Sequence, residues 1–269
     1  MRQINRYLSN KIQASKIVAT DENIRRILHD EIKRLGSNAD LNHIDVSKVT
    51  NMDNLFANAI YMADFNDYST EFYGDVSEWN VSNAKTMAHM FERNKKFNCD
   101  LSNWDVHQVE DMTNMFYKCE NFEGIGLDKW HVYKVKDIQC MFFECEKFSA
   151  DLSNWQFDKL LSARSAFCKC FSFNSDLNDW NMSNCRNMQH MLRYCINFNK
   201  PLDKWKFSQM PVPSFEFILN GAKNFCQDLS MWQIPVNKVS SQKIIDKLLK
   251  QMFDGTQMIP KYMPSIVKI

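Results

Sequence analysis

Seven tryptophans recur at a nearly constant spacing, and this spacing limits what the chain can fold into. The steps between neighbouring tryptophans are 25, 26, 25, 25, 25 and 27 residues. The residues are Trp79, Trp104, Trp130, Trp155, Trp180, Trp205 and Trp232. A period between about 20 and 50 residues is typical of proteins built from stacked repeats. We therefore expect a row of similar coils.

The residues around each tryptophan predict the structure of one coil. Trp104 and Val106 alternate with the polar Asp105, which is the pattern of a short strand with one buried face. An apolar run with the spacing of one helix face follows. This run is Val109, Met112, Met115, Phe116 and Cys119. We expect one strand, one short helix and two turns per coil, and neighbouring coils must stack because one coil cannot bury its own apolar face.

The repeat occupies residues 37–239, in seven to eight units, and both flanking segments predict helices that cover its ends. Residues 1–36 predict a first helix with Ile4, Tyr7, Leu8 and Ile12 on its apolar face. A second helix is expected to begin at a cap, Thr20 or Asp21, and to end at Gly36.

Residues 240–269 predict a C-terminal helix and a tail. Ser240 or Ser241 can cap the helix, and Gly255 can end it. Three units depart from the pattern: the first carries an insertion before Phe72, one has an extra residue before Trp130 beside Gly124 and Gly126, and the seventh has Pro211 and Pro213 where its helix should begin.

Composition narrows the function classes. The net charge is +1, from 33 basic and 32 acidic residues with interspersed signs, which argues against a nucleic-acid surface. No apolar stretch approaches the length of about 18 residues that a membrane span needs. No signal-peptide pattern precedes Val18, so we interpret the nine cysteines as reduced thiols and expect a cytoplasmic protein.

The motif W-D-V-x-x-V-x-D-M-T-N-M-F-x-x-C-x-x-F at residues 104–122 resembles the BspA-like surface-protein repeat, also called the DUF285 or mycoplasma lipoprotein-associated repeat. The motif D-L-S-N-W, at residues 100–104 and 151–155, shares this resemblance. The similarity covers roughly residues 40 to 234. It implies an α/β solenoid that is right-handed and leucine-rich-repeat-like, that binds other proteins and that has no cofactor or catalytic residues. Many members are surface adhesins, whereas others are intracellular, in protists and large DNA viruses.

Four cysteines share one position in consecutive units, which raises the question of a zinc site. They are Cys119, Cys145, Cys170 and Cys195. A zinc site brings all its sulfur ligands within about 2.3 Å of one ion. One cysteine per coil produces a line of sulfur atoms about 4.8 Å apart or more. We therefore expect a row of buried thiols, with no metal and no cofactor.

Enzyme motifs are missing from the sequence. His89 and His190 share one phase but lie four units apart, so they cannot meet. Neither H-E-x-x-H nor a paired C-x-x-C motif occurs, and Gly124-x-Gly126 lacks the remaining residues of a phosphate loop. We expect a protein that is not an enzyme. An enzyme that uses a cysteine nucleophile stays an alternative, although the sequence names no Cys–His pair.

Positions that vary while the repeat stays constant are the candidate binding residues. Strand alternation turns them out of the core, so they form one continuous surface, which we call the strand-side face. It consists of Asn80, Asp105, His131, Gln156, Asn181 and Lys206 directly after the tryptophans, with His107 and Tyr133 two residues further on. His107, His131 and Tyr133 form the expected centre. The alternative is a solvated polar surface without a partner.

The sequence therefore predicts a non-enzymatic binding or scaffold protein that engages a protein partner through the strand-side face or the apolar tail. A place in a larger assembly, such as a virion, is one form of this hypothesis. An adhesin-like surface protein is the alternative from another class, and the state of the thiols distinguishes the two.

Overall fold

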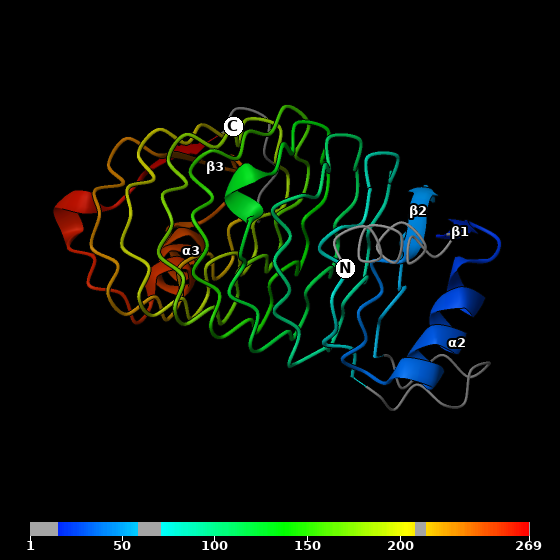
Figure 1. The fold of residues 1–269 in the computed structure, drawn as a ribbon. Helices are drawn as coiled ribbons and strands as arrows, with labels where there is room; N and C mark the ends of the chain where they lie inside the picture. The colour runs from blue at the N-terminus through cyan, green and yellow to red at the C-terminus, as the bar shows by residue number, and fades with distance from the viewer. Residues whose placement is uncertain (1–15, 59–70, 208–213, 269) are drawn as a thin grey trace, which may run out of the picture.

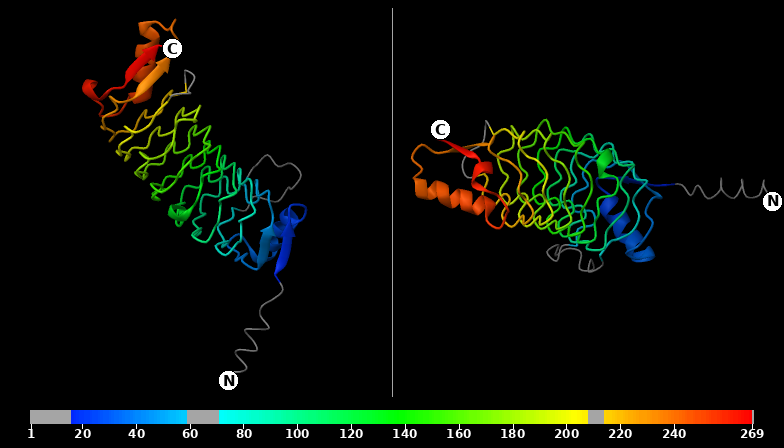
Figure 2. Two further views of the ribbon diagram at one scale, coloured as in Figure 1. Left: turned by 90° about the horizontal axis from the view of Figure 1, so that it is seen from above. Right: turned by 90° about the vertical axis from the view of Figure 1, so that its left-hand side faces the viewer.

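The computed structural model describes residues 16–58, 71–207 and 214–268. In this part the backbone runs through a row of stacked coils (Figure 1). Strand β1 (Ile17–Thr20), helix α2 (Ile24–Leu35) and strand β2 (Ile44–Lys48) lie at one end of the row. Strand β3 (Gln233–Val236), helix α3 (Gln242–Phe253) and strand β4 (Ser265–Lys268) lie at the other end (Figure 2).

Backbone hydrogen bonds join each coil to the next at the same phase of the repeat. A continuous series of single parallel bridges runs through Asn51, Thr86, Asp111, Asp137, Ser162 and Asn187. A separate bridge pairs Asp40 with Asp75. Most neighbours in the series are 25 or 26 residues apart, which is the spacing of the tryptophans. The sequence period is therefore the length of chain in one coil.

The short helix expected after each tryptophan is wrong, because this segment is a run of turns. The N–H of Met115 donates to the carbonyl of Met112 three residues earlier, at 3.2 Å. The adjacent N–H of Phe116 instead donates to the carbonyl of Met141 in the next coil, at 2.9 Å. Among the described residues, α-helix is confined to α2 and α3, and the short 3₁₀ helices are η1 (Leu127–Lys129) and η2 (Pro260–Tyr262).

Left-handed residues explain how the turns replace a helix. Asn114 and Lys118 have φ angles of 54° and 59°, and the residues at these two positions share this conformation in the coils from His89 to Gly221. A helix keeps every interior N–H bond within itself, which would leave no donors to bind the next coil. In these turns an N–H bonds to the carbonyl three residues earlier, so residues are still buried at helix-like intervals. The apolar sequence pattern is therefore the same for a helix and for these turns.

The strand expected at each tryptophan forms only at the ends of the row. β1 pairs with β2, and β3 pairs with β4, both in parallel. In between, none of the described segments after the tryptophans forms a strand. The predicted alternation is nevertheless confirmed, because Trp104 and Val106 are buried and Asp105 is exposed.

Helix α2 packs on the N-terminal end of the core through Ile24, Leu28 and Ile32. Its N-cap is Asn23, so the expectation of Thr20 or Asp21 is wrong. The carboxylate of Asp21 accepts hydrogen bonds from the Thr50 and Asn51 N–H groups instead, at 2.7 and 3.0 Å. The helix ends at Gly36, with φ 89°, as predicted.

Helix α3 packs on the C-terminal end of the core. Ser241 is its N-cap, since its Oγ accepts a hydrogen bond from the Ile244 N–H at 3.4 Å. The helix ends one residue before Gly255, at the C-cap Asp254. The expected first helix with Ile4, Tyr7, Leu8 and Ile12, the insertion before Phe72, and the prolines Pro211 and Pro213 all lie outside the described residues.

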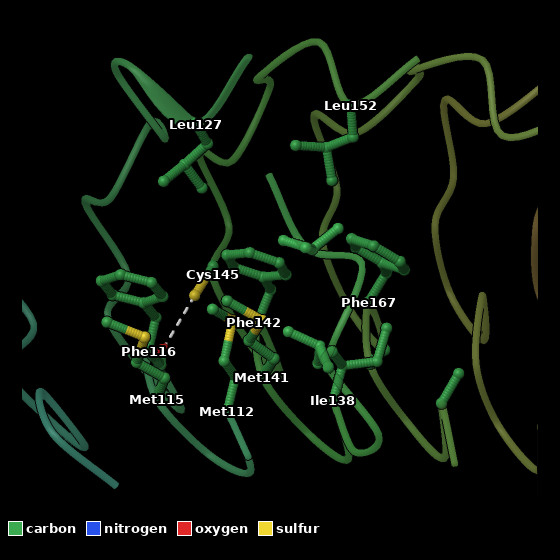
Figure 3. Packing of buried hydrophobic residues seen from close by; sticks show 14 of the residues in the cluster. Met112, Met115, Phe116, Leu127, Ile138, Met141, Phe142, Cys145, Leu152 and Phe167 are labelled. Atoms are coloured by element: carbon green, nitrogen blue, oxygen red, sulfur yellow. Dashed lines mark hydrogen bonds between the residues drawn. The ribbon is translucent and has the colours of Figure 1, made fainter. Parts of the chain in front are cut away.

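Stacked aromatic rings fill the interior of the row (Figure 3). Within one coil, the rings of Phe116 and Phe122 stack with centroids 4.1 Å apart. Between coils, Phe116 stacks on Phe142 at 5.7 Å. Each buried aromatic side chain removes about 150–250 Å² from water, so this interior stabilises the row.

Candidate functional site

The tryptophans fix the position of the strand-side face. Trp130 stacks on Trp104 and Trp155, with ring centroids 6.3 and 6.2 Å apart, and all seven tryptophans are buried. The indole N–H of each tryptophan donates to a backbone carbonyl of the preceding coil; for Trp155 the acceptor is Leu127 at 2.7 Å. The residue after each tryptophan is therefore held at a defined place on the surface.

The structure places the predicted binding residues on the outside of the row. The residues that directly follow the tryptophans are all exposed: Asn80, Asp105, His131, Gln156, Asn181 and Lys206. Tyr133 is exposed as well, with 42% of its surface accessible. His107 is half-buried.

Several residues of the strand-side face also stabilise the local backbone. The side-chain oxygens of Asn80, Asp105 and Asn181 each accept a hydrogen bond from the N–H two residues later, at 3.2 Å. These local bonds shape the turn that follows the tryptophan. At the same position His131 stacks its ring on Tyr133, with centroids 5.8 Å apart and an interplanar angle of 10°. The middle of the face therefore presents an aromatic pair in a row of small polar turns.

A polar network beside this pair links two coils. Nδ1 of His107 lies 2.7 Å from a carboxylate oxygen of Asp105, and its Nε2 lies 2.6 Å from the Gln108 amide nitrogen. The Gln108 oxygen accepts a hydrogen bond from Lys134 of the next coil, at 2.5 Å. The network therefore joins His107 to the coil that carries His131 and Tyr133.

Glu110 and Lys136 add an ion pair to the same surface, at 2.5 Å. The hydrogen bond from Lys136 holds the pKa of Glu110 below its usual value, and the charges of Lys159 and Lys134 act in the same direction. Sequence reasoning missed Gln108, Glu110, Lys134 and Lys136. The sequence could have indicated them, because the residues at the fourth and sixth positions after each tryptophan vary from unit to unit.

The four aligned cysteines form a row of buried thiols. Each Sγ donates to the carbonyl of a core residue in the preceding coil; Cys145 bonds to Phe116 at 2.9 Å (Figure 3). Burial raises the pKa of the Cys145 thiol well above its usual value. In the coil before Cys119, the buried Asn94 has the same position and donates from its amide nitrogen to the carbonyl of Phe56, at 2.6 Å. In these five coils the position therefore supplies a hydrogen-bond donor to the preceding coil, whereas the next coil has the buried Ala222 there.

Burial raises the pKa of the other thiols wherever a shift is resolved. Burial raises the pKa values of Cys99, Cys168 and Cys185 to about 12. Burial also raises the pKa of Cys140, although Ser165 and Arg164 counteract it. A thiol with a raised pKa is seldom a thiolate at neutral pH.

A second surface lies over the run of turns, and we call it the turn-side face: Arg93, Tyr117, Lys118, Phe143, Glu144 and Lys169. Tyr117 stacks on Phe143 with centroids 4.9 Å apart. Glu144 lies between Lys118 and Lys169, at 3.2 and 2.5 Å. These residues bind one another, so the surface is largely satisfied by its own contacts. Because the sequence predicts helices in these segments, it does not reveal the turn-side face.

The two aligned histidines, His89 and His190, lie on this same side at left-handed positions. His190 stacks on Phe217 at 5.0 Å, and burial lowers its pKa. His89 lies beside Glu92, at 2.5 Å. Their separate partners agree with the expectation that these two histidines do not form one site.

Other features of the described part of the chain are few. A cavity of about 240 Å³ lies beside α3, between Leu249, Phe253, Met258 and Met263. In residues 16–58, 71–207 and 214–268, no three His, Cys, Asp or Glu side chains are arranged to hold a metal ion. The helices in these ranges are too short or too polar to cross a membrane.

Comparison with known proteins gives one family. No curated protein and no solved structure matches the chain. The model of a family described as "Mycoplasma protein of unknown function, DUF285" matches residues 28–125 and again residues 120–232. The two matches together cover most of the chain and coincide with the row of coils. The protein therefore belongs to the DUF285 family, the BspA-like repeat family.

Proposed function

We propose that this protein is a non-enzymatic binding or scaffold protein that engages a protein partner through its strand-side face. The observation that carries the proposal is the aromatic pair of His131 and Tyr133, which is exposed in the middle of a face that the buried tryptophans hold in place. Exposed aromatic residues on a rigid surface are typical anchors of protein interfaces.

The architecture that belongs to this proposal is a right-handed solenoid of the leucine-rich-repeat type. The bridges that join coils at a constant phase support it. A solenoid presents an extended surface whose residues are set by the repeat, and such surfaces serve to bind partners.

The thiols support a function outside catalysis. Burial raises the pKa of each cysteine of the aligned row. A cysteine nucleophile needs the opposite environment, with a lowered pKa and an adjacent base. We therefore favour binding over the alternative of a cysteine-dependent enzyme.

Affinity capture tests the proposed face. Wild type is compared with a chain in which His107, His131 and Tyr133 are replaced by alanine. The matched control replaces three exposed residues elsewhere, Glu146, Lys147 and Tyr194.

We expect the control to recover the same partner as wild type and the triple variant at His107, His131 and Tyr133 to lose it. Both variants should melt near the wild-type temperature, because exposed side chains contribute little to stability. Equal recovery by the two variants would reject the strand-side face.

A further inference from the structure

Each end of the row of coils finishes in a β-strand with an open edge. β1 pairs in parallel with β2, and β4 pairs in parallel with β3, so each sheet has two strands. Among the described residues, neither β1 nor β4 has a partner on its other side. The two strands lie at opposite ends of the row (Figure 2).

The bonds already made show which backbone groups face outward. The N–H of Ile17 donates to His43 beside β2, at 3.1 Å, and the N–H of Ser265 donates to Trp232 beside β3, at 2.9 Å. In a parallel ladder, a strand residue turns its N–H and C=O toward one neighbour, and the next residue turns them to the opposite side. The N–H and C=O of Val18 therefore point away from β2, and those of Ile266 point away from β3.

The two strands occupy the same side of the coil. β2 begins at Ile44, which has the position of the tryptophan in the first unit, and β3 begins directly after Trp232. Both pairs are parallel, so β1 and β4 run in the same direction as the coils between them. A second copy placed further along the row would present its β1 parallel to β4 of the first copy. The Ile266 N–H could then donate to the Val18 C=O.

The side chains of the two strands match as well. Each strand contains an Ile-Val pair, Ile17-Val18 in β1 and Ile266-Val267 in β4. The exposed fractions are 38% for Ile17, 47% for Val18 and 37% for Val267, and Ile266 is partly buried against the core. β-branched residues are favoured in paired strands, and an exposed apolar edge is a template for pairing with another chain.

We propose that copies of this protein assemble end to end, with β4 of one copy pairing in parallel with β1 of the next. The contact uses two different surfaces, so it does not close into a symmetric dimer and instead extends into a linear assembly. This inference is independent of the proposed partner on the strand-side face, because it uses the ends of the row.

Blocking variants test the pairing in the full-length chain. Val18→Pro removes the outward N–H of β1 and leaves the bonds of Ile17 to β2 in place. Ile266→Pro removes the outward N–H of β4. Lys268→Pro is a second β4 variant, which changes an exposed residue with the same outward orientation. Tyr133→Ala is the control on the strand-side face, and thermal melting confirms that each variant is folded.

Sedimentation velocity across a concentration series measures the assembly. We expect the average mass of wild type and Tyr133→Ala to rise from the 31.8 kDa monomer past the dimer as concentration increases. Val18→Pro and the β4 variants should each remain monomeric alone. A mixture of Val18→Pro with a β4 variant should form dimers and stop there, because one intact β4 meets one intact β1.

Three results would overturn the proposal. Wild type could remain monomeric throughout the series, or folded Val18→Pro could assemble as wild type does. A folded β4 variant that forms dimers alone would show a symmetric contact between two β1 strands instead.

Discussion

The indole N–H of Trp130 donates a hydrogen bond to the backbone carbonyl of Leu101 in the preceding coil, at 3.2 Å. One side chain therefore fills the core of its own coil and gives a second hydrogen bond to a buried carbonyl of another, which also accepts from the Trp104 N–H at 3.1 Å. The same bond recurs at every tryptophan, from Trp79 to Trp232. A phenylalanine at these positions could not make this bond.

Substitution of Trp130 separates these two contributions. Trp130→Phe removes this bond but leaves the Leu101 carbonyl bonded to the Trp104 N–H, so we expect the free energy of unfolding to fall by about 0.5–1.5 kcal/mol. Trp130→Ala also creates a cavity and should cost about 3–5 kcal/mol. Urea denaturation followed by circular dichroism measures both, with Tyr133→Ala as the exposed control. A Trp130→Ala midpoint equal to that of the control would contradict the buried position of the indole.

Asn94 gives a second test of the bonds between coils. Its amide nitrogen donates to Phe56, and its oxygen accepts from the Phe72 N–H at 2.7 Å. Asn94→Ala removes both bonds, and each loss costs about 0.5–1.5 kcal/mol. Asn94→Cys introduces the donor that the following coils use and should retain part of the stability. The idea fails if the cysteine variant unfolds at the same denaturant concentration as the alanine variant.

Buried thiols make the free energy of unfolding depend on pH in the alkaline range. Burial raises the pKa of the Cys185 thiol to about 12, whereas the pKa of a cysteine in an unfolded chain is about 8.5. Above that lower value the unfolded chain binds fewer protons than the native chain, so the free energy of unfolding falls as pH rises. This contribution is fully present below the unfolded pKa and is lost as pH rises through the folded pKa.

The variant Cys185→Val tests this dependence. Val109 and Val135 have the same position in other coils, so the substitution should be tolerated. Chemical denaturation at a series of pH values from neutral to alkaline should give a shallower decline for Cys185→Val than for wild type. Parallel curves for the two proteins would show that Cys185 does not contribute.

At Gly126 an aspartate, the residue that other coils have at this position, would destabilise the protein. Four residues before Trp104 and Trp155 lie aspartates, but before Trp130 the residue is Gly126, with φ +87°. A Cβ at Gly126 would overlap with the backbone of Ser102. Gly126→Asp should therefore destabilise the protein by more than the cost of a left-handed residue alone, about 1–2 kcal/mol.

Gly36→Ala is the matched control for Gly126→Asp. Gly36 has a similar φ of +89°, but the nearest atom to its added Cβ is 3.6 Å away. We expect the control to show only the backbone cost in a thermal melt. An equal loss for Gly36→Ala and Gly126→Asp would indicate that the close approach to Ser102 is unimportant.

The sequence predicts the interior of this protein better than its backbone. The period places Trp104, Phe116 and Cys119 in the core because burial depends on side-chain type and spacing. It cannot distinguish a helix from successive turns at Met112–Cys119, since both bury residues at similar intervals. The left-handed Asn114 and Lys118 decide between them, and neither residue type requires that conformation.

The candidate site is predictable only in part for a related reason. Alternation around Trp130 places His131 and Tyr133 on the surface. The bond from Lys134 to Gln108 depends on which residues face each other across two coils. This register follows from the bridges between coils, which the spacing of tryptophans alone does not specify.

Successive N–H groups such as those of Met115 and Phe116 donate first within their own coil and then to the next coil. This alternation also determines how a chain of this kind can change in length. Duplicating or deleting a whole unit by recombination leaves every remaining N–H opposite a carbonyl. Inserting a single residue among the turns shifts the following donors to the wrong side. Whole units are therefore the increments that preserve the bonds between coils, and the one extra residue in the step from Trp104 to Trp130 lies outside the turns, after Phe122.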